Sequence, residues 1–183
     1  MSSSMRYDAV AIALHWAVAA LILGLVAVGF TMTGLKPGSP LQFQLYQGHK
    51  SLGITVLALT LLRLGWRLAH RPPPLPETMS PGERRLARAG HAALYLLMLA
   101  MPLLGWAVVS TSPFNIPTVL FGVIPFPHLP LPHGVNATAK LLHLSGAWMM
   151  IVTVLGHGAA ALRHHYLLGD DVLRRMLPRF GGK

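Results

Sequence analysis

Long apolar segments dominate the pattern of this chain and predict four membrane-spanning helices. Each segment has at least about 18 residues and few charges, which is the length and composition that a helix needs to cross a bilayer. The segments are residues 9–33, 51–68, 89–110 and 141–162. The other residues mostly form connections. We therefore expect one all-α domain over residues 1–183, an integral membrane four-helix bundle.

Turn residues set the expected limits of these helices. The stretch 34–40 is rich in Gly and Pro, so it predicts a turn, and the second helix is expected to begin near Gln47. The prolines at 72–74 are expected to end that helix. Before the third span, Ser80 and Glu83 have the spacing of a capping box, which predicts a helical segment leading into the membrane.

The distribution of basic residues predicts the orientation of the bundle. If the N-terminus, the second loop and the C-terminal tail are cytoplasmic, every arginine and Lys183 lie on the inner side, and only Lys36, Lys50 and Lys140 lie outside. Cytoplasmic loops carry an excess of Lys and Arg. We therefore expect an N-in/C-in topology in contact with membrane lipid. This asymmetry also explains the net charge of +10 without a nucleic-acid partner.

Composition narrows the chemistry further. Hydrophobic residues make up 53% of the chain, charged residues 11%, and cysteine is absent. The absence of cysteine excludes disulfides, thiolate-bound iron–sulfur clusters and thioether-attached haem. The first apolar segment is too long for the hydrophobic region of a cleavable signal peptide, so we expect it to remain as the first helix.

Two histidines within the last apolar segment are the strongest chemical signal. His143 and His157 are separated by 14 positions. This spacing places both imidazoles on one helix face, roughly 21 Å apart in depth. Ionisable side chains inside a membrane are costly and usually functional. A helix with two stacked ligand positions therefore suggests two cofactors, one near each membrane surface.

The predicted topology supplies a partner for each of these histidines. His15, near the inner end of the first helix, matches the depth of His157, and His49, at the start of the second helix, matches that of His143. Paired imidazoles suit a low-spin, electron-transferring haem. Hydrogen bonds between helices are the simpler alternative. A zinc or copper site fits poorly, because each pair offers only two ligands.

Arg63 lies 14 positions after His49 and hence on the same face of the second helix, roughly 21 Å deeper. We expect it to meet the carboxylates of the inner haem. Extension of the side chain to lipid headgroups is the alternative.

The order and spacing of several short motifs resemble bacterial cytochrome b561 over nearly the whole chain. These motifs are Arg6-Tyr7-Asp8, Leu14-His15-Trp16, Gly48-His49-Lys50-Ser51-Leu52-Gly53, Gly90-His91, His143, His157, Arg163-His164-His165-Tyr166 and Leu173-Arg174-Arg175-Met176-Leu177-Pro178. The resemblance implies a multi-pass protein of the bacterial inner membrane with two non-covalent b haems, held between the fourth helix and the first and second. Its implied ligand pairs, His15 with His157 and His49 with His143, agree with the depth argument.

The resemblance also implies an activity, the oxidation of superoxide at the outer face with electrons passing to ubiquinone. Lys50, next to His49, is then the leading candidate for attracting superoxide; an ordinary solvated rim is the alternative. At the inner end, motif position selects His164 as the proton donor to the quinone, and Arg6 could hold a quinone oxygen. For both residues the alternative is contact with lipid headgroups.

Two other functions stay open. The chain could be a haem subunit that links a dehydrogenase or hydrogenase-type redox partner protein to the quinone pool, although its short tails favour an independent enzyme. It could also be a non-redox helical membrane protein, such as a small transporter or an assembly factor.

Overall fold

The structure, a computed structural model, describes residues 6–178. Within that range four long helices follow one another, each long and apolar enough to span a membrane. They are α1 (Ala9–Gly34), α2 (Pro40–Ala69), α3 (Pro81–Ser110) and α4 (Asn136–Tyr166). The shorter elements are strands β1 (Thr118–Leu120) and β2 (Ile124–Phe126) and the 3₁₀ turns η1 (His133–Val135) and η2 (Arg174–Met176).

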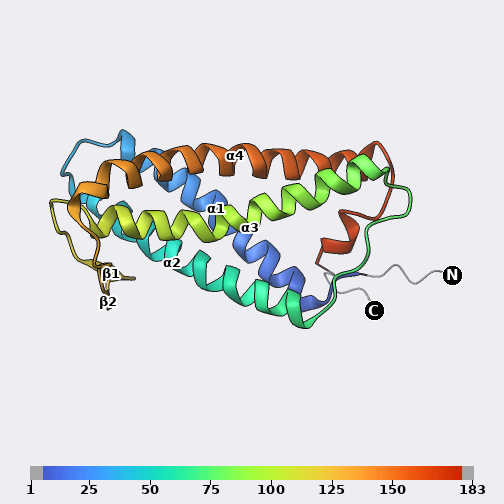
Figure 1. The fold of residues 1–183 in the computed structure, drawn as a ribbon, viewed down its shortest axis with the longest axis horizontal. Helices are drawn as coiled ribbons and strands as arrows, with labels where there is room; N and C mark the ends of the chain where they lie inside the picture. The colour runs from blue at the N-terminus through green and yellow to red at the C-terminus, as the bar shows by residue number, and fades with distance from the viewer. Residues whose placement is uncertain (1–5, 179–183) are drawn as a thin grey trace.

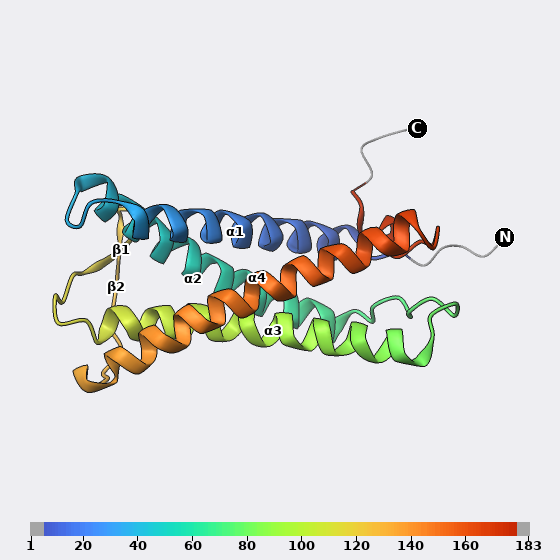
Figure 2. The same ribbon diagram turned by 90° about the horizontal axis from the view of Figure 1, so that it is seen from above.

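The helices form an up-and-down bundle, as expected (Figures 1 and 2). α3 packs most extensively against α4, α1 packs against α2, and α2 also packs against α3. The first residues of α1 and the segment after α4 lie at the same end of the bundle (Figure 1). With four crossings, both described ends therefore lie on one side of the membrane, which we call the inner end.

Helix α2 begins earlier than the sequence suggested. It starts at Pro40 instead of near Gln47, because Ser39 caps it: the Ser39 hydroxyl accepts a hydrogen bond from the Gln42 N–H. Proline fits the first turn of a helix, where its missing N–H would have no partner anyway. His49 consequently lies well inside α2 and does not open it. The apolar span 51–68 is only the deeper part of this helix.

The other helix starts follow the expected capping chemistry. The Asp8 carboxylate accepts a hydrogen bond from the Ala11 N–H at 2.8 Å. Ser80 and Glu83 form a complete capping box, each side chain accepting from the backbone of the other. α3 then runs without a break through Pro102.

The apolar core lies halfway along the bundle. Its buried members come from all four helices and are Val18, Ile22, Val56, Leu97, Met98 and Met150. Met150 is midway in sequence between His143 and His157, so this core separates the two histidine levels. Burial of these side chains fixes how the helices pack around both levels.

The connection between α3 and α4 folds over the outer end of the bundle. β1 and β2 pair as an antiparallel hairpin in which Thr118 lies opposite Phe126. The hairpin is fastened to α2, because the Phe121 N–H donates to the Ser51 hydroxyl at 2.9 Å. The side-chain amide of Gln47 also donates to the Pro117 carbonyl. This loop covers the outer end of the bundle.

Candidate functional site

The outer histidine pair is formed by α2 and α4. The ring centroids of His49 and His143 are 6.3 Å apart, and the ring planes cross at 76°. A cavity of about 500 Å³, which we call the outer cavity, surrounds both imidazoles. Glycines from three helices line it, namely Gly29, Gly53 and Gly105. Its volume is in the range of cofactor pockets, and the absence of side chains at these glycines leaves room beside the imidazoles.

The inner pair is formed by α1 and α4. The ring centroids of His15 and His157 are 6.2 Å apart. The structure therefore brings together the histidines that share a depth in the sequence argument, at nearly the same separation in both pairs.

This geometry fits haem. Two imidazoles bound to opposite faces of one metal ion through bonds of about 2 Å have ring centroids roughly 6 Å apart. The Nδ1 atoms of His15 and His49 are buried without a hydrogen-bond partner among the described residues, so an interhelical hydrogen bond at Nδ1 does not account for these two imidazoles. Across residues 6–178, no three His, Asp or Glu side chains gather closely enough to hold a metal ion. Haem needs only two protein ligands, because the porphyrin supplies the others.

A third imidazole joins the inner pair. The His91 ring, from α3, lies 5.4 Å from that of His157, centroid to centroid. In the sequence, His91 stood out only as part of the Gly90-His91 motif. Its contact with His157 depends on how α3 packs against α4, which residue spacing does not reveal.

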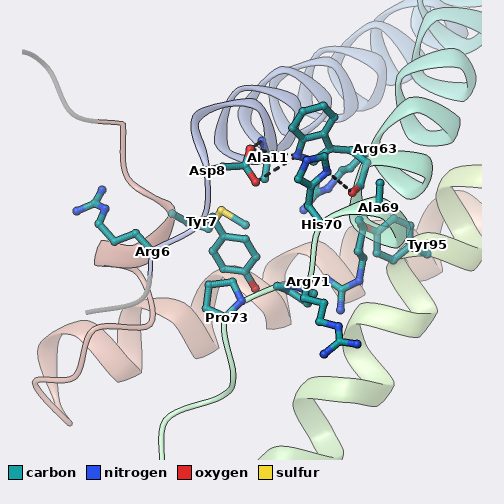
Figure 3. Close-up of a pocket in the computed structure, with 14 residues that line it drawn as sticks. Arg6, Tyr7, Asp8, Ala11, Arg63, Ala69, His70, Arg71, Pro73 and Tyr95 are labelled. Carbon is teal, nitrogen blue, oxygen red and sulfur yellow. Dashed lines mark hydrogen bonds between the residues drawn. The ribbon is translucent and has the colours of Figure 1, made fainter. Parts of the chain in front are cut away.

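A second cavity, of about 440 Å³, opens at the inner end (Figure 3). Its walls come from the start of α1, the end of α2, α3 and the C-terminal segment. The basic residues that line it are Arg6, Arg63, Arg67, His70 and Arg71, and Asp8 is the one acid in its lining. We call this space the inner cavity.

Asp8 and two aromatic rings form one wall of the inner cavity. The Trp66 indole N–H donates to both Asp8 carboxylate oxygens, at 3.1 and 3.2 Å. The His70 ring stacks on Trp66 with a centroid separation of 3.9 Å. Although burial alone would raise the pKa of Asp8, hydrogen bonds from Ala11 and Trp66 outweigh it and hold that pKa below its usual value.

Arg63 occupies the position that the sequence predicted. It lines the inner cavity, its guanidinium lies 5.8 Å from the Tyr95 ring centroid, and it is close enough to His15 and His157 to act on both electrostatically. This position suits a cation that binds the carboxylates of an inner haem.

The two residues proposed for the quinone do not share one cavity. Arg6 lines the inner cavity, but its guanidinium donates to the Leu177 carbonyl and points away from His70 and Arg71 (Figure 3). His164 is buried and does not line that cavity. Its Nδ1 lies 2.5 Å from an Asp170 carboxylate oxygen, a pairing that the sequence argument missed. The sequence feature that could have indicated this pairing is the position of Asp170 just beyond the end of α4. Gly169, directly before it, adopts a φ of 67° and turns the chain back toward the helix.

At the outer end, Lys50 is half-buried, and its ammonium donates to the Pro117 carbonyl at 3.2 Å. Lys50 and Lys140 both line the outer cavity, together with no acid, whereas Lys36 is exposed and lies outside its lining. The structure thus separates two outer lysines that face the cavity from one that does not.

Comparison with known proteins agrees with this architecture. Residues 6–179 match the family described as prokaryotic cytochrome b561. Cytochrome b561 homolog 2 of Escherichia coli is 37% identical over 174 residues, covering 94% of this chain and 91% of that protein. The probable superoxide oxidase CybB of Yersinia pestis is 32% identical over 185 residues, covering 97% and 98%.

Cytochrome b561 homolog 1 of E. coli is 30% identical over 176 residues, covering 95% of this chain and 98% of that protein. Its match, like the other two, spans nearly the full length of both chains. The family implies b-type haem and transmembrane electron transfer, and four membrane-spanning helices fit a multi-pass protein of the bacterial inner membrane. This chain belongs to the prokaryotic cytochrome b561 family.

Proposed function

We propose that this protein holds two b haems and carries electrons across the membrane, oxidising superoxide at the outer face and reducing ubiquinone. The observation that carries the proposal is the presence of two imidazole pairs, with ring separations of 6.3 and 6.2 Å, that share α4. The superoxide step is supported by the 32% identity with a protein named as a probable superoxide oxidase.

In this proposal, α4 is the shared wall of the electron path. His143 and His157 bind from α4, while His49 and His15 bind from α2 and α1. Bound haem supplies reversible one-electron chemistry. The residues of the chain fix the spacing and exclude water: the buried core around Met150 keeps the interval between the two levels dry. Rigid helices hold both sites without a moving carrier.

The outer lysines suit an anionic substrate. Lys50 and Lys140 line the outer cavity, and no carboxylate opposes them there. A cleft lined by one sign of charge raises the local concentration of an ion of the other sign. Lys50 has the stronger case, because its hydrogen bond to Pro117 fixes the ammonium in a cavity that His49 also lines. We assign it the role of attracting superoxide.

At the inner end, ubiquinone reduction consumes protons as well as electrons. His164 lies on the same face of α4 as His157, about two turns closer to the inner end, and it is paired with Asp170. A carboxylate that orients an imidazole favours directed proton transfer. We assign His164 the proton-donating role. Arg6 holds the C-terminal segment through Leu177, and it is proposed to bind the quinone oxygen on the side of its guanidinium that is directed away from His70 and Arg71 (Figure 3).

A second candidate function is that of a haem subunit docked to a redox partner protein. The observation in its favour is the tip of the β1–β2 hairpin, where Phe121, Val123 and Ile124 are exposed. Co-purification of a partner that is lost when these three side chains are replaced by Ser would support it.

Haem quantitation with optical difference spectra tests the proposal. We expect two haems per chain in the wild type and one after either His49→Ala or His143→Ala. The double variant should also retain one haem per chain, because both residues hold the same haem. His15→Ala and His157→Ala should likewise affect one common haem. Wild-type protein in vesicles should couple superoxide loss to quinone reduction. A chain without haem would contradict the proposal entirely, whereas haem without superoxide activity would contradict only the substrate.

A further inference from the structure

The inner cavity holds more positive charge than the chain itself neutralises. Arg63, Arg67 and Arg71 line it, and in the described part of the chain none of their guanidinium groups donates a hydrogen bond to another residue or forms an ion pair. Asp8, the one acid of the lining, already accepts hydrogen bonds from Ala11 and Trp66. The cavity therefore presents unpaired guanidinium groups to whatever occupies it.

Packing holds two of these arginines together. The Arg63 and Arg67 guanidinium carbons lie 5.8 and 6.0 Å from the centroid of the same Tyr95 ring. The two residues are one helical turn apart, where like charges destabilise a helix. An anion bound between them would remove this repulsion. Guanidinium groups are suited to phosphate, because their planar fork donates two parallel hydrogen bonds to its oxygens.

The setting of the inner cavity favours a lipid as the source of that phosphate. The cavity lies at the predicted cytoplasmic end, between transmembrane helices, where basic pockets bind the headgroups of anionic lipids. Tyr7, Trp66 and Tyr95 also line it, and aromatic side chains are enriched at this depth of a membrane. Figure 3 shows the Tyr7 ring directed between Pro73 and Arg71, an apolar surface beside a cationic one.

We propose that the inner cavity binds the phosphate group of an anionic phospholipid, with Arg67 and Arg71 as the principal donors. Arg63 contributes to the same positive field while it faces the inner histidine pair. The site is independent of the electron donor and of the substrate at the outer face. Through it, the lipid would join the end of α2 to the start of α1 and to Met176 of the C-terminal segment, all of which line the cavity.

Native mass spectrometry of the haem-loaded protein tests the proposal with phosphatidylglycerol as the probe. The wild type should retain one phosphatidylglycerol molecule in preference to phosphatidylcholine. The double variant Arg67→Gln/Arg71→Gln should bind it roughly 30-fold more weakly. The matched control is Arg85→Gln/Arg88→Gln, which removes the same charge from exposed positions on α3 outside the cavity. This control should retain the wild-type affinity.

Other outcomes would overturn the proposal. Equal retention of phosphatidylglycerol and phosphatidylcholine by the wild type, a measurement that needs no variant, would exclude recognition of the anionic headgroup. Equal weakening by both double variants would show a general surface charge effect. If inorganic phosphate binds as tightly as the lipid, the ligand is free phosphate. If short-chain ubiquinone displaces the lipid, or the Arg67/Arg71 variant loses haem, the cavity belongs to the quinone or to the haem carboxylates.

Discussion

Gly105 lies directly against the imidazole of His143: a Cβ atom added at Gly105 would lie 3.1 Å from Cε1 of His143. Such an approach is tighter than ordinary van der Waals contact, so glycine keeps α3 close to the ring without displacing it. The adjacent contact is tighter still, because a Cβ at Gly146 of α4 would collide with the Met101 sulfur of α3. Small residues therefore set the position of the proposed outer ligand.

We expect Gly105→Val to displace His143 and to remove most of the outer haem, because the added branches meet the imidazole. The apoprotein should also lose about 1–3 kcal/mol of stability, as in other overpacked sites. Haem content per chain and thermal unfolding measure the two effects. Gly24→Val is the control, since nothing lies within 4 Å of a Cβ at Gly24. Full haem content with an unchanged spectrum in Gly105→Val would refute this role.

Arg63→Leu is expected to lower the midpoint potential of the inner haem. A nearby cation favours the reduced, more negative form of a redox centre, so its removal favours the oxidised form. The shift should be on the order of 60 mV, a tenfold change in the equilibrium constant of a one-electron couple. A potentiometric titration measures it. Arg88→Leu, at an exposed position on α3, should leave both potentials unchanged, and an identical titration for Arg63→Leu would remove the assignment.

Lys50→Gln is expected to slow reduction of the outer haem by superoxide roughly twofold to tenfold and to weaken the dependence of that rate on salt. The reason is that Lys50 faces the outer cavity, whereas Lys36 does not. Lys36→Gln should therefore behave as the wild type. Pulse-radiolysis kinetics at several ionic strengths measure both variants. Rates that do not respond to salt even in the wild type would show that steering is absent.

Residue spacing predicted the depth of each histidine because the rise of a helix is regular. Charge then predicted the direction of each crossing, which was enough to pair His49 with His143 and His15 with His157. The start of α2 was missed because Pro40 is compatible with either a turn or a first helical turn, and the Ser39 cap decides between them.

Contacts between neighbouring helices, and between helices and the C-terminal segment, could not be predicted from the sequence for a different reason. The approach of His91 to His157 depends on helix packing. The C-terminal segment folds back under the bundle through single long-range bonds, such as that from the Trp16 indole N–H to the Met176 carbonyl at 2.7 Å. Neither contact leaves a periodic signal in the sequence, and the inner cavity has Met176 of this C-terminal segment in its wall.

The lowered pKa of Asp8 predicts a loss of stability in acid. Its folded-state pKa lies below the model-compound value of 3.8. The stabilising contribution is therefore complete above the unfolded value and is lost as the pH falls through the folded one. Asp8→Asn keeps a good helix cap but has no carboxylate, so its unfolding temperature should fall less steeply below about pH 4. Parallel acid profiles for the two proteins would argue against any contribution of the Asp8 carboxylate.

Asp170→Asn is expected to slow ubiquinone reduction on the order of tenfold while leaving haem content and outer-haem reduction unchanged. The carboxylate that faces His164 is lost, but an amide oxygen can still accept from the Val172 N–H, as Asp170 does at 3.0 Å. Asp171→Asn is the matched control, because among the described contacts Asp171 uses only its backbone carbonyl, toward Arg175. Stopped-flow reoxidation of the reduced protein by a short-chain quinone separates the two steps. If Asp170→Asn and Asp171→Asn reoxidise at the same rate, His164 acts without its carboxylate, and the proton reaches the quinone by another route.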